Sequence, residues 1–146
     1  MAETITLRHL GPADLKILLG VKEGLFDHAI RPDQAEAFLA DPLHEIVLAF
    51  DKAEVVGMAS GQVMLHPDKA PAFFIAEVGV RDAYLRQGIA KRMCVRLCDV
   101  ARARGCDAIW LATEESNAPA RALYQSLDAR AVQGVVVYDW KDAMDA

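Results

Sequence analysis

The stretch EVGVRDAYLRQGIA, residues 77–90, decides the fold of this chain. It joins an apolar segment at 73–80, which predicts a β-strand, to residues 89–105, whose apolar side chains recur at helical spacing. The basic turn between them contains Gly88. A strand that enters a helix through such a turn gathers backbone N–H groups at the positive end of the helix dipole. The stretch therefore predicts a site for an anion such as a pyrophosphate, and so a ligand that contains a nucleotide.

This turn differs from the two best-known phosphate-binding loops. Gly88 is followed by Ile89 and Ala90, not by the Lys-Ser/Thr pair of a Walker loop. A dinucleotide fingerprint needs further glycines after a first strand, and the turn has a single one. The kind of nucleotide ligand must therefore be inferred from other parts of the chain.

Length and composition favour one globular domain over residues 1–146, because 53% of the residues are hydrophobic and 25% are charged. No apolar run approaches the ~20 residues that span a bilayer, and the first residues lack the features of a signal peptide. We therefore expect a cytoplasmic protein without a membrane partner. The cysteines, Cys94, Cys98 and Cys106, have no fourth partner or neighbouring histidine, so they predict neither a disulfide framework nor a metal site.

The charge distribution narrows the range of partners. A net charge of −5 is not the basic surplus of a nucleic-acid binder, so we expect no nucleic-acid partner. The basic residues gather between Arg81 and Arg104, whereas the remainder of the chain is acidic. This pattern suits an anionic cofactor and a cationic second substrate. Mixed surface charge that serves only solubility explains it equally well.

Apolar patterning predicts a mixed α/β (α+β) fold. Strands are expected at 4–10, 45–50, 54–65, 73–80 and 108–113, with closing strands within 129–140. Helices are expected from 11–14 to about 25, from 31–33 to about 41, at 89–105 and at 117–127. This order gives an antiparallel front half and a strand–helix–strand crossover in the back half.

Three segments carry a resemblance to a known family: Val78-Gly79-Val80, Arg86-Gln87-Gly88-Ile89-Ala90, and Asn117 to Tyr124. Their spacing resembles the acetyl-CoA-binding motifs of the GNAT superfamily of N-acetyltransferases, as does the order of elements along nearly the whole chain. The resemblance implies a central, mostly antiparallel, splayed sheet of six to seven strands flanked by about four helices. It also implies an acetyl-CoA-dependent acyltransferase.

The same resemblance implies where the cofactor binds. The strands at 73–80 and 108–113 would part around a bulge near 77–79, and the amide-rich pantetheine arm would pair with the open edge. Val78, Gly79 and Val80 would line this arm, and an amide near Val78 would stabilise the oxyanion. Backbone amides of Arg86, Gln87, Gly88, Ile89 and Ala90 would hold the pyrophosphate. Asn117 and Ala120 would contact the cofactor, although Asn117 also suits a helix N-cap.

Two residues are candidates for proton transfer. Tyr124 resembles the tyrosine that protonates the departing thiolate in this superfamily, and its ordinary pKa near 10 suits an acid. The alternative is a helix aromatic packed in the core. Glu77 is a candidate base, or an anchor for the incoming ammonium, because a carboxylate on an apolar strand needs a reason. The alternative is a strand-edge residue that faces solvent.

Three further acids, Asp27, Glu114 and Glu115, are candidates for binding the cationic substrate, with solvated loop acids as the alternative. Two positions depart from the family pattern. Leu85 stands where Gln or Arg usually begins the anion turn, and Asp128 stands where glycine often follows the last helix. Because main-chain amides make most phosphate contacts, we still expect cofactor binding.

Within the superfamily, the chain most resembles the short aminoglycoside 3-N-acetyltransferases. The segments that carry this likeness are Phe26-Asp27, Gln34 to Leu39, His66 to Lys69, Glu77 to Val80, and Thr113 to Asn117. It implies acetylation of an amine on the deoxystreptamine ring, and hence antibiotic resistance. The alternatives are another small amine, a protein N-terminus, or a non-catalytic acyl-CoA-sensing module. The apolar run 135–138 makes a homodimer plausible.

Overall fold

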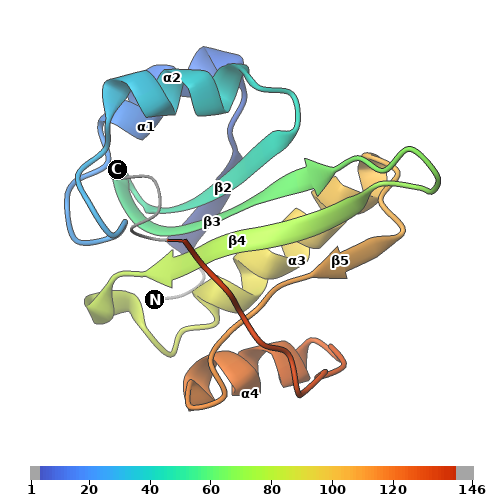
Figure 1. Ribbon diagram of the computed structural model, residues 1–146. Helices are drawn as coiled ribbons and strands as arrows, with labels where there is room; N and C mark the ends of the chain where they lie inside the picture. Colours follow the sequence, from blue (N-terminus) through green and yellow to red (C-terminus); the bar gives the residue numbers. More distant parts are fainter. Residues whose placement is uncertain (1–3, 141–146) are drawn as a thin grey trace. The chain divides into compact units, whose positions relative to one another are not determined.

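The computed structural model describes residues 4–140, which fall into two units, one ending at Glu114 and the other beginning at Glu115. In the first unit the described strands form one sheet in the order β1-β2-β3-β4-β5 (Figure 1). These strands are β1 (Ile5–His9), β2 (His44–Asp51), β3 (Glu54–Met64), β4 (Ala72–Val80) and β5 (Ala108–Trp110). β1 to β4 pair antiparallel, and β5 lies parallel to β4. The predicted fold class is confirmed, whereas a single domain over 1–146 stays a prediction.

One face of the sheet is covered by α1 (Leu15–Leu19) and α2 (Pro32–Ala40), which Figure 1 shows together above the strands. A 3₁₀ turn at Pro12–Asp14 precedes α1, and the helix ends at Gly20. The predicted continuation of this helix to residue 25 is therefore wrong. The apolar residues beyond Gly20 pack from a loop instead: Val21, Leu25 and Phe26 belong to or contact the core beneath α1 and α2.

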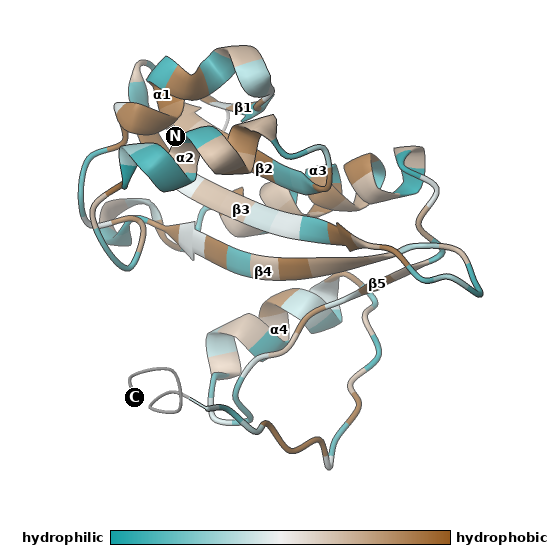
Figure 2. Ribbon diagram, turned by 45° about the horizontal axis from the view of Figure 1, so that its top comes forward, coloured by the Kyte–Doolittle hydropathy of each residue, from teal (hydrophilic) through white to brown (hydrophobic). Residues whose placement is uncertain are grey.

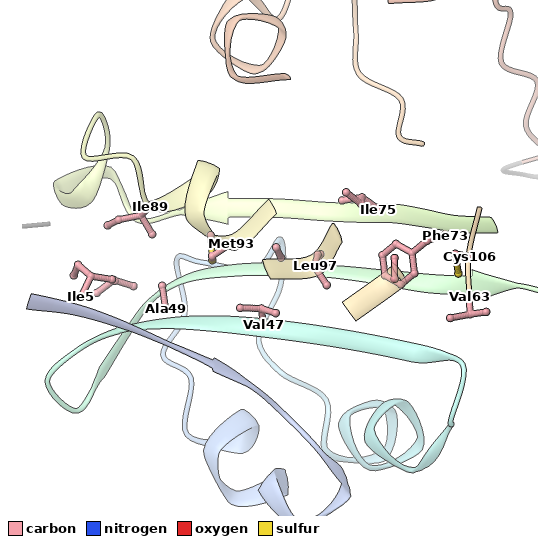
Figure 3. Packing of buried hydrophobic residues seen from close by; sticks show 13 residues of the cluster. Ile5, Val47, Ala49, Val63, Phe73, Ile75, Ile89, Met93, Leu97 and Cys106 are labelled. Carbon is pink, nitrogen blue, oxygen red and sulfur yellow. The ribbon is translucent and has the colours of Figure 1, made fainter. Parts of the chain in front are cut away.

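The other face is covered by α3 (Ile89–Ala103), which begins directly after Gly88. Ile89, Met93 and Leu97 are 0–1% exposed and lie one helical turn apart, so they form a single stripe against the strands (Figure 3). This core also contains Phe73, whose ring fills the space above Gly61. A Cβ at Gly61 would lie 2.3 Å from the Phe73 ring, so the strand must carry glycine there.

β4 contains the bulge that the family resemblance implies, placed slightly earlier than expected. Ser60 pairs with Glu77 and Gly61 pairs with Ile75, so Ala76 is the extra residue. The bulge lies next to the expected stretch 77–79. It interrupts the two-residue alternation of side chains, and this decides the direction of every later side chain on β4.

β5 pairs with only the first part of β4, residues 72–74 with residues 108–110. In the described part of the chain, residues 75–80 therefore have no strand partner along that edge. Figure 1 shows that the chain diverges from β4 once it has passed β5. The predicted parting of the two strands is thus present, although β5 ends at Trp110 and not at 113.

The second unit contains α4 (Ala118–Ser126), followed by residues 129–140 without helix or strand. The predicted closing strands are therefore wrong for the described residues, and five strands stand where six to seven were expected. Val135, Val136 and Val137 favour strands locally, but a strand also needs a hydrogen-bonded neighbour. In this coil, brown in part in Figure 2, the three valines are 68–78% exposed.

Candidate active site

The bulge in β4 determines which way Glu77 points. Before the bulge, Phe73 and Ile75 face α3; after it, Val78 and Val80 pack on that same side. Glu77 therefore lies on the opposite face, beside its cross-strand neighbour Ser60. The carboxylate is exposed on the face that also carries α1 and α2.

The loop between α1 and α2 brings a second carboxylate to this place. Leu25 lies against β4, because a Cβ at Gly79 would be 3.4 Å from the Leu25 carbonyl oxygen. Two residues later, Asp27 acts electrostatically on Glu77. Partial burial, and then the nearby Asp27 charge, raise the pKa of Glu77 above its ordinary value. The structure thus joins two acids that the sequence proposed separately.

Arg81 fixes this loop to the sheet. Its Nε donates to the carbonyl oxygen of Val55 at 2.8 Å, its Nη1 to that of Glu23 at 2.8 Å, and its Nη2 to that of Lys22 at 2.7 Å. The loop turns at Gly24 with a φ of 101°, a conformation that favours glycine. In the sequence Arg81 is only part of a basic stretch, and no neighbouring residue indicates its partners.

The basic turn has the geometry expected of an anion site. Arg86 and Gly88 have φ values of 63° and 76°, and Gly88 forms the N-cap of α3. A Cβ at Gly88 would meet nothing within 4 Å, so the turn is open to a ligand. Leu85, which departs from the family pattern, is 51% exposed. Helix dipole, free space and adjacent cations together suit a pyrophosphate.

An open groove of about 410 Å³ begins at Gly88 and runs along α3 beside Leu7 of β1. The acidic Asp99 lines its far end, and nearer Gly88 it is lined by three cationic residues of α3, Lys91, Arg92 and Arg96. Their charge matches an anionic ligand at the start of the helix. Tyr84 supports the turn from the other side, since its hydroxyl donates to Asp51 Oδ2 at 2.6 Å.

Another carboxylate, Glu45, is excluded as a reactive group by its partners. It is 9% exposed and lies at the start of β2. His9 Nε2 lies 2.8 Å from one of its oxygens, and Arg104 forms an ion pair with the other. These partners satisfy the buried charge and tie β2 to the end of α3, so the role of Glu45 is structural.

In the second unit, Asn117 is the N-cap of α4: its side-chain oxygen accepts from the Ala120 amide at 3.1 Å. Tyr124 is half-buried on the same helix, and Glu115 is exposed. Glu114, also exposed, ends the first unit. No helix among residues 4–140 is long and apolar enough to cross a membrane, and no group of three or more potential metal ligands occurs there.

Residues 16–128 match the model of the acetyltransferase (GNAT) family. The chain belongs to this family. Members of the GNAT family use acetyl-CoA, and the anion turn at Arg86–Ala90 fits the pyrophosphate of that cofactor. This family model spans both the parted strands of the first unit and α4 of the second.

Among curated relatives, the [ribosomal protein bS18]-alanine N-acetyltransferase of Escherichia coli K12 is 39% identical over 74 residues. The match covers 51% of this chain and 47% of the relative, so the chain aligns with about half the length of that protein.

Solved structures share the fold over nearly the whole chain. The aminoglycoside acetyltransferase meta-AAC0020, from an uncultured soil metagenomic sample, in complex with sisomicin gives a TM-score of 0.83 at 16% identity, covering 94% of this chain and 96% of that one. AAC(6')-Iy in complex with the bisubstrate analog CoA-S-monomethyl-acetylneamine gives 0.78 at 17% identity, covering 93% and 97%. At such identities these solved structures establish the fold only.

Proposed function

We propose that this GNAT protein is an acetyl-CoA-dependent N-acetyltransferase whose acceptor is an amine of an aminoglycoside, with the 3-amino group of the deoxystreptamine ring as the position and antibiotic resistance as the consequence. The observation that carries the proposal is the pair of carboxylates, Asp27 and Glu77, on one face of the sheet beside the open edge of β4. Two adjacent acids attract and hold a cationic amine.

Each group of residues has its own role in the proposed acetyl transfer. Amides of Arg86, Gln87, Gly88, Ile89 and Ala90 hold the pyrophosphate, and Val78, Gly79 and Val80 line the open edge of β4. When bound, acetyl-CoA supplies the activated acetyl group as a thioester. The Val78 N–H is the donor we assign to the carbonyl oxygen that gains charge during transfer.

Glu77 takes the proton from the acceptor ammonium at a carboxylate oxygen, directly or through water. Its raised pKa brings it closer to neutral pH, which makes it a better proton acceptor than an ordinary glutamate. Asp27 keeps the cation in place. Glu114 and Glu115 are proposed to contact further amines of a polycationic acceptor.

Tyr124 is proposed as the acid that returns a proton to the departing sulfur, an assignment that rests on the resemblance of Asn117–Tyr124 to the family motif. A phenol with a pKa near 10 is protonated at neutral pH and can donate to a thiolate. Tyr124→Phe should lower kcat by about 10²- to 10⁴-fold with little change in acceptor KM. An unchanged kcat would show that Tyr124 is not the acid.

The likeness to a ribosomal-protein-alanine acetyltransferase favours a second candidate acceptor, a protein N-terminus. Thiol release from acetyl-CoA, measured with sisomicin, other aminoglycosides, polyamines and alanine-starting peptides, separates the candidates. Turnover with peptides alone would overturn the aminoglycoside proposal. Cofactor binding without release for any acceptor would favour a sensing module, and NMR of an acetylated product would identify the amine.

A further inference from the structure

Two aromatic side chains stand together where β4 and β5 are paired. Phe74 and Trp110 are register partners, and their ring centroids are 4.5 Å apart with planes tilted by 39°. Trp110 nevertheless remains 48% exposed. An indole that is supported on one side and open on the other offers a flat apolar surface to a ligand.

The register shows which face carries this pair. Phe73, Ile75 and Ile109 belong to or contact the core beneath α3. Since successive side chains on a strand alternate, Phe74 and Trp110 lie on the opposite face. The core beneath α1 and α2 includes neither ring, so these two helices do not bury the aromatic pair.

The bulge places Glu77 on this same face. Between Phe74 and Glu77 the strand advances by two to three residue steps, which is about 7–10 Å. The exposed Ala76 lies between them and adds little bulk. The aromatic pair and the Glu77 carboxylate thus lie on one face of β4, and Asp27 adds a second negative charge near Glu77. Together the two acids supply charge that a cationic ligand complements.

We propose that Trp110, supported by Phe74, forms an acceptor subsite that stacks against the C–H face of an amino-sugar ring whose ammonium group is held by Asp27 and Glu77. The inference rests on the proposed function and extends it, because it names which part of the acceptor is recognised beside the reacting amine. The flat face of the ring covers the indole, and ammonium groups on the same ring add cation–π attraction.

The chain makes a direct binding experiment simple, because its two tryptophans are Trp110 and Trp140. In a Trp140→Phe background, Trp110 is the sole indole, and its fluorescence is titrated with sisomicin in the absence of acetyl-CoA. We expect a saturable change of intensity or wavelength. No change up to concentrations that saturate turnover would overturn the subsite.

Kinetics give an independent readout. Trp110→Ala should raise acceptor KM roughly 3- to 30-fold while kcat and the KM for acetyl-CoA stay within about twofold, and Trp110→Phe should recover most of the loss. Trp140→Ala is the matched control, since Trp140 is another exposed indole, 73% accessible, and should leave KM unchanged. Circular dichroism and thermal melting establish that each variant is folded.

The outcomes separate the two proposals. If the Trp140→Phe protein acetylates sisomicin and Trp110→Ala has the parent KM, the subsite is wrong and the proposed function stands. If no aminoglycoside is acetylated and an alanine-starting peptide alters Trp110 fluorescence instead, the amino-sugar ligand and the aminoglycoside acceptor are overturned together.

Discussion

Arg81 Nη1 donates a hydrogen bond of 2.8 Å to the carbonyl oxygen of Glu23, although the two residues are 58 positions apart in sequence. The same guanidinium reaches Val55 and Lys22, so one side chain at the end of β4 holds the loop that carries Asp27. A lysine has one compact ammonium and cannot reproduce this planar set of donors.

Both Arg81→Lys and Arg81→Ala should therefore lower acceptor kcat/KM, by about 10- to 100-fold for alanine, because the loop carboxylate loses its position. Cofactor affinity should change little, since the main-chain amides of the anion turn remain. The acidic limb of the pH–rate profile should move to lower pH as Asp27 leaves Glu77. Arg102→Ala, which breaks an exposed pair with Asp99, is the control. If Arg102→Ala lowered kcat/KM as much as Arg81→Ala, the positioning role of Arg81 would be contradicted.

Glu77→Gln should lower kcat/KM and abolish the acidic limb of the pH profile. The variant should also melt at a higher temperature than the parent at pH 7. The pKa of Glu77 is raised in the folded protein, so its ionisation disfavours the folded state above the unfolded value near 4.3. Below that value Glu77 is protonated in both the folded and the unfolded protein, so the gain in melting temperature should vanish. A melting-temperature gain that persists at pH 3 would argue for a different cause.

Gly61→Ala should destabilise the first unit by ~1–3 kcal/mol, because its Cβ would lie 2.3 Å from Phe73 and 2.5 Å from the Phe74 carbonyl oxygen. Gly57→Ala is the matched variant on the same strand: there the nearest atom, at 3.0 Å, is the mobile end of Met93. Urea unfolding should show the larger loss at Gly61. Equal losses would mean that the close approach of Phe73 relaxes without cost.

Tyr84→Phe should lower the melting temperature and weaken cofactor binding slightly, because the hydrogen bond to Asp51 that supports the anion turn is lost. That hydrogen bond raises the pKa of Tyr84, so its contribution is present below pH ~10 and fades as the phenol ionises above its folded pKa. Thermal melts of parent and variant should therefore converge only at strongly alkaline pH.

Local patterns predicted most of the first unit. The strand at 73–80, the basic turn and the helix from Ile89 each have a signature within a short window, and all three stand close to the predicted bounds. The helix expected to reach residue 25 ends at Gly20, because Val21 and Leu25 find their apolar environment by folding back as a loop. Sequence periodicity cannot separate these two ways of burying the same residues.

The candidate site, too, was only partly predictable from local sequence patterns. The sequence singles out Glu77 as a carboxylate on an apolar strand and Asp27 as a candidate for binding a cationic substrate, but their proximity depends on a bulge at Ala76 and on three hydrogen bonds from Arg81. The pairing of Phe74 with Trp110 likewise depends on strand register. Such contacts join distant positions, so no local pattern announces them. The valine run at 135–137 is the converse case, since strong strand propensity there meets no strand neighbour in the described residues.

Straightening the bulge while keeping Ala76 would leave every functional group of β4 chemically intact, yet it would reverse the side of each residue from Glu77 onward. Glu77 would then project into the apolar layer of Ile89 and Met93, whereas Val78 would turn toward the acids' former position. The capacity of this sheet to meet an amine therefore depends on parity: on whether an even or an odd number of the residues between Phe73 and the carboxylate follows the regular alternation of the strand.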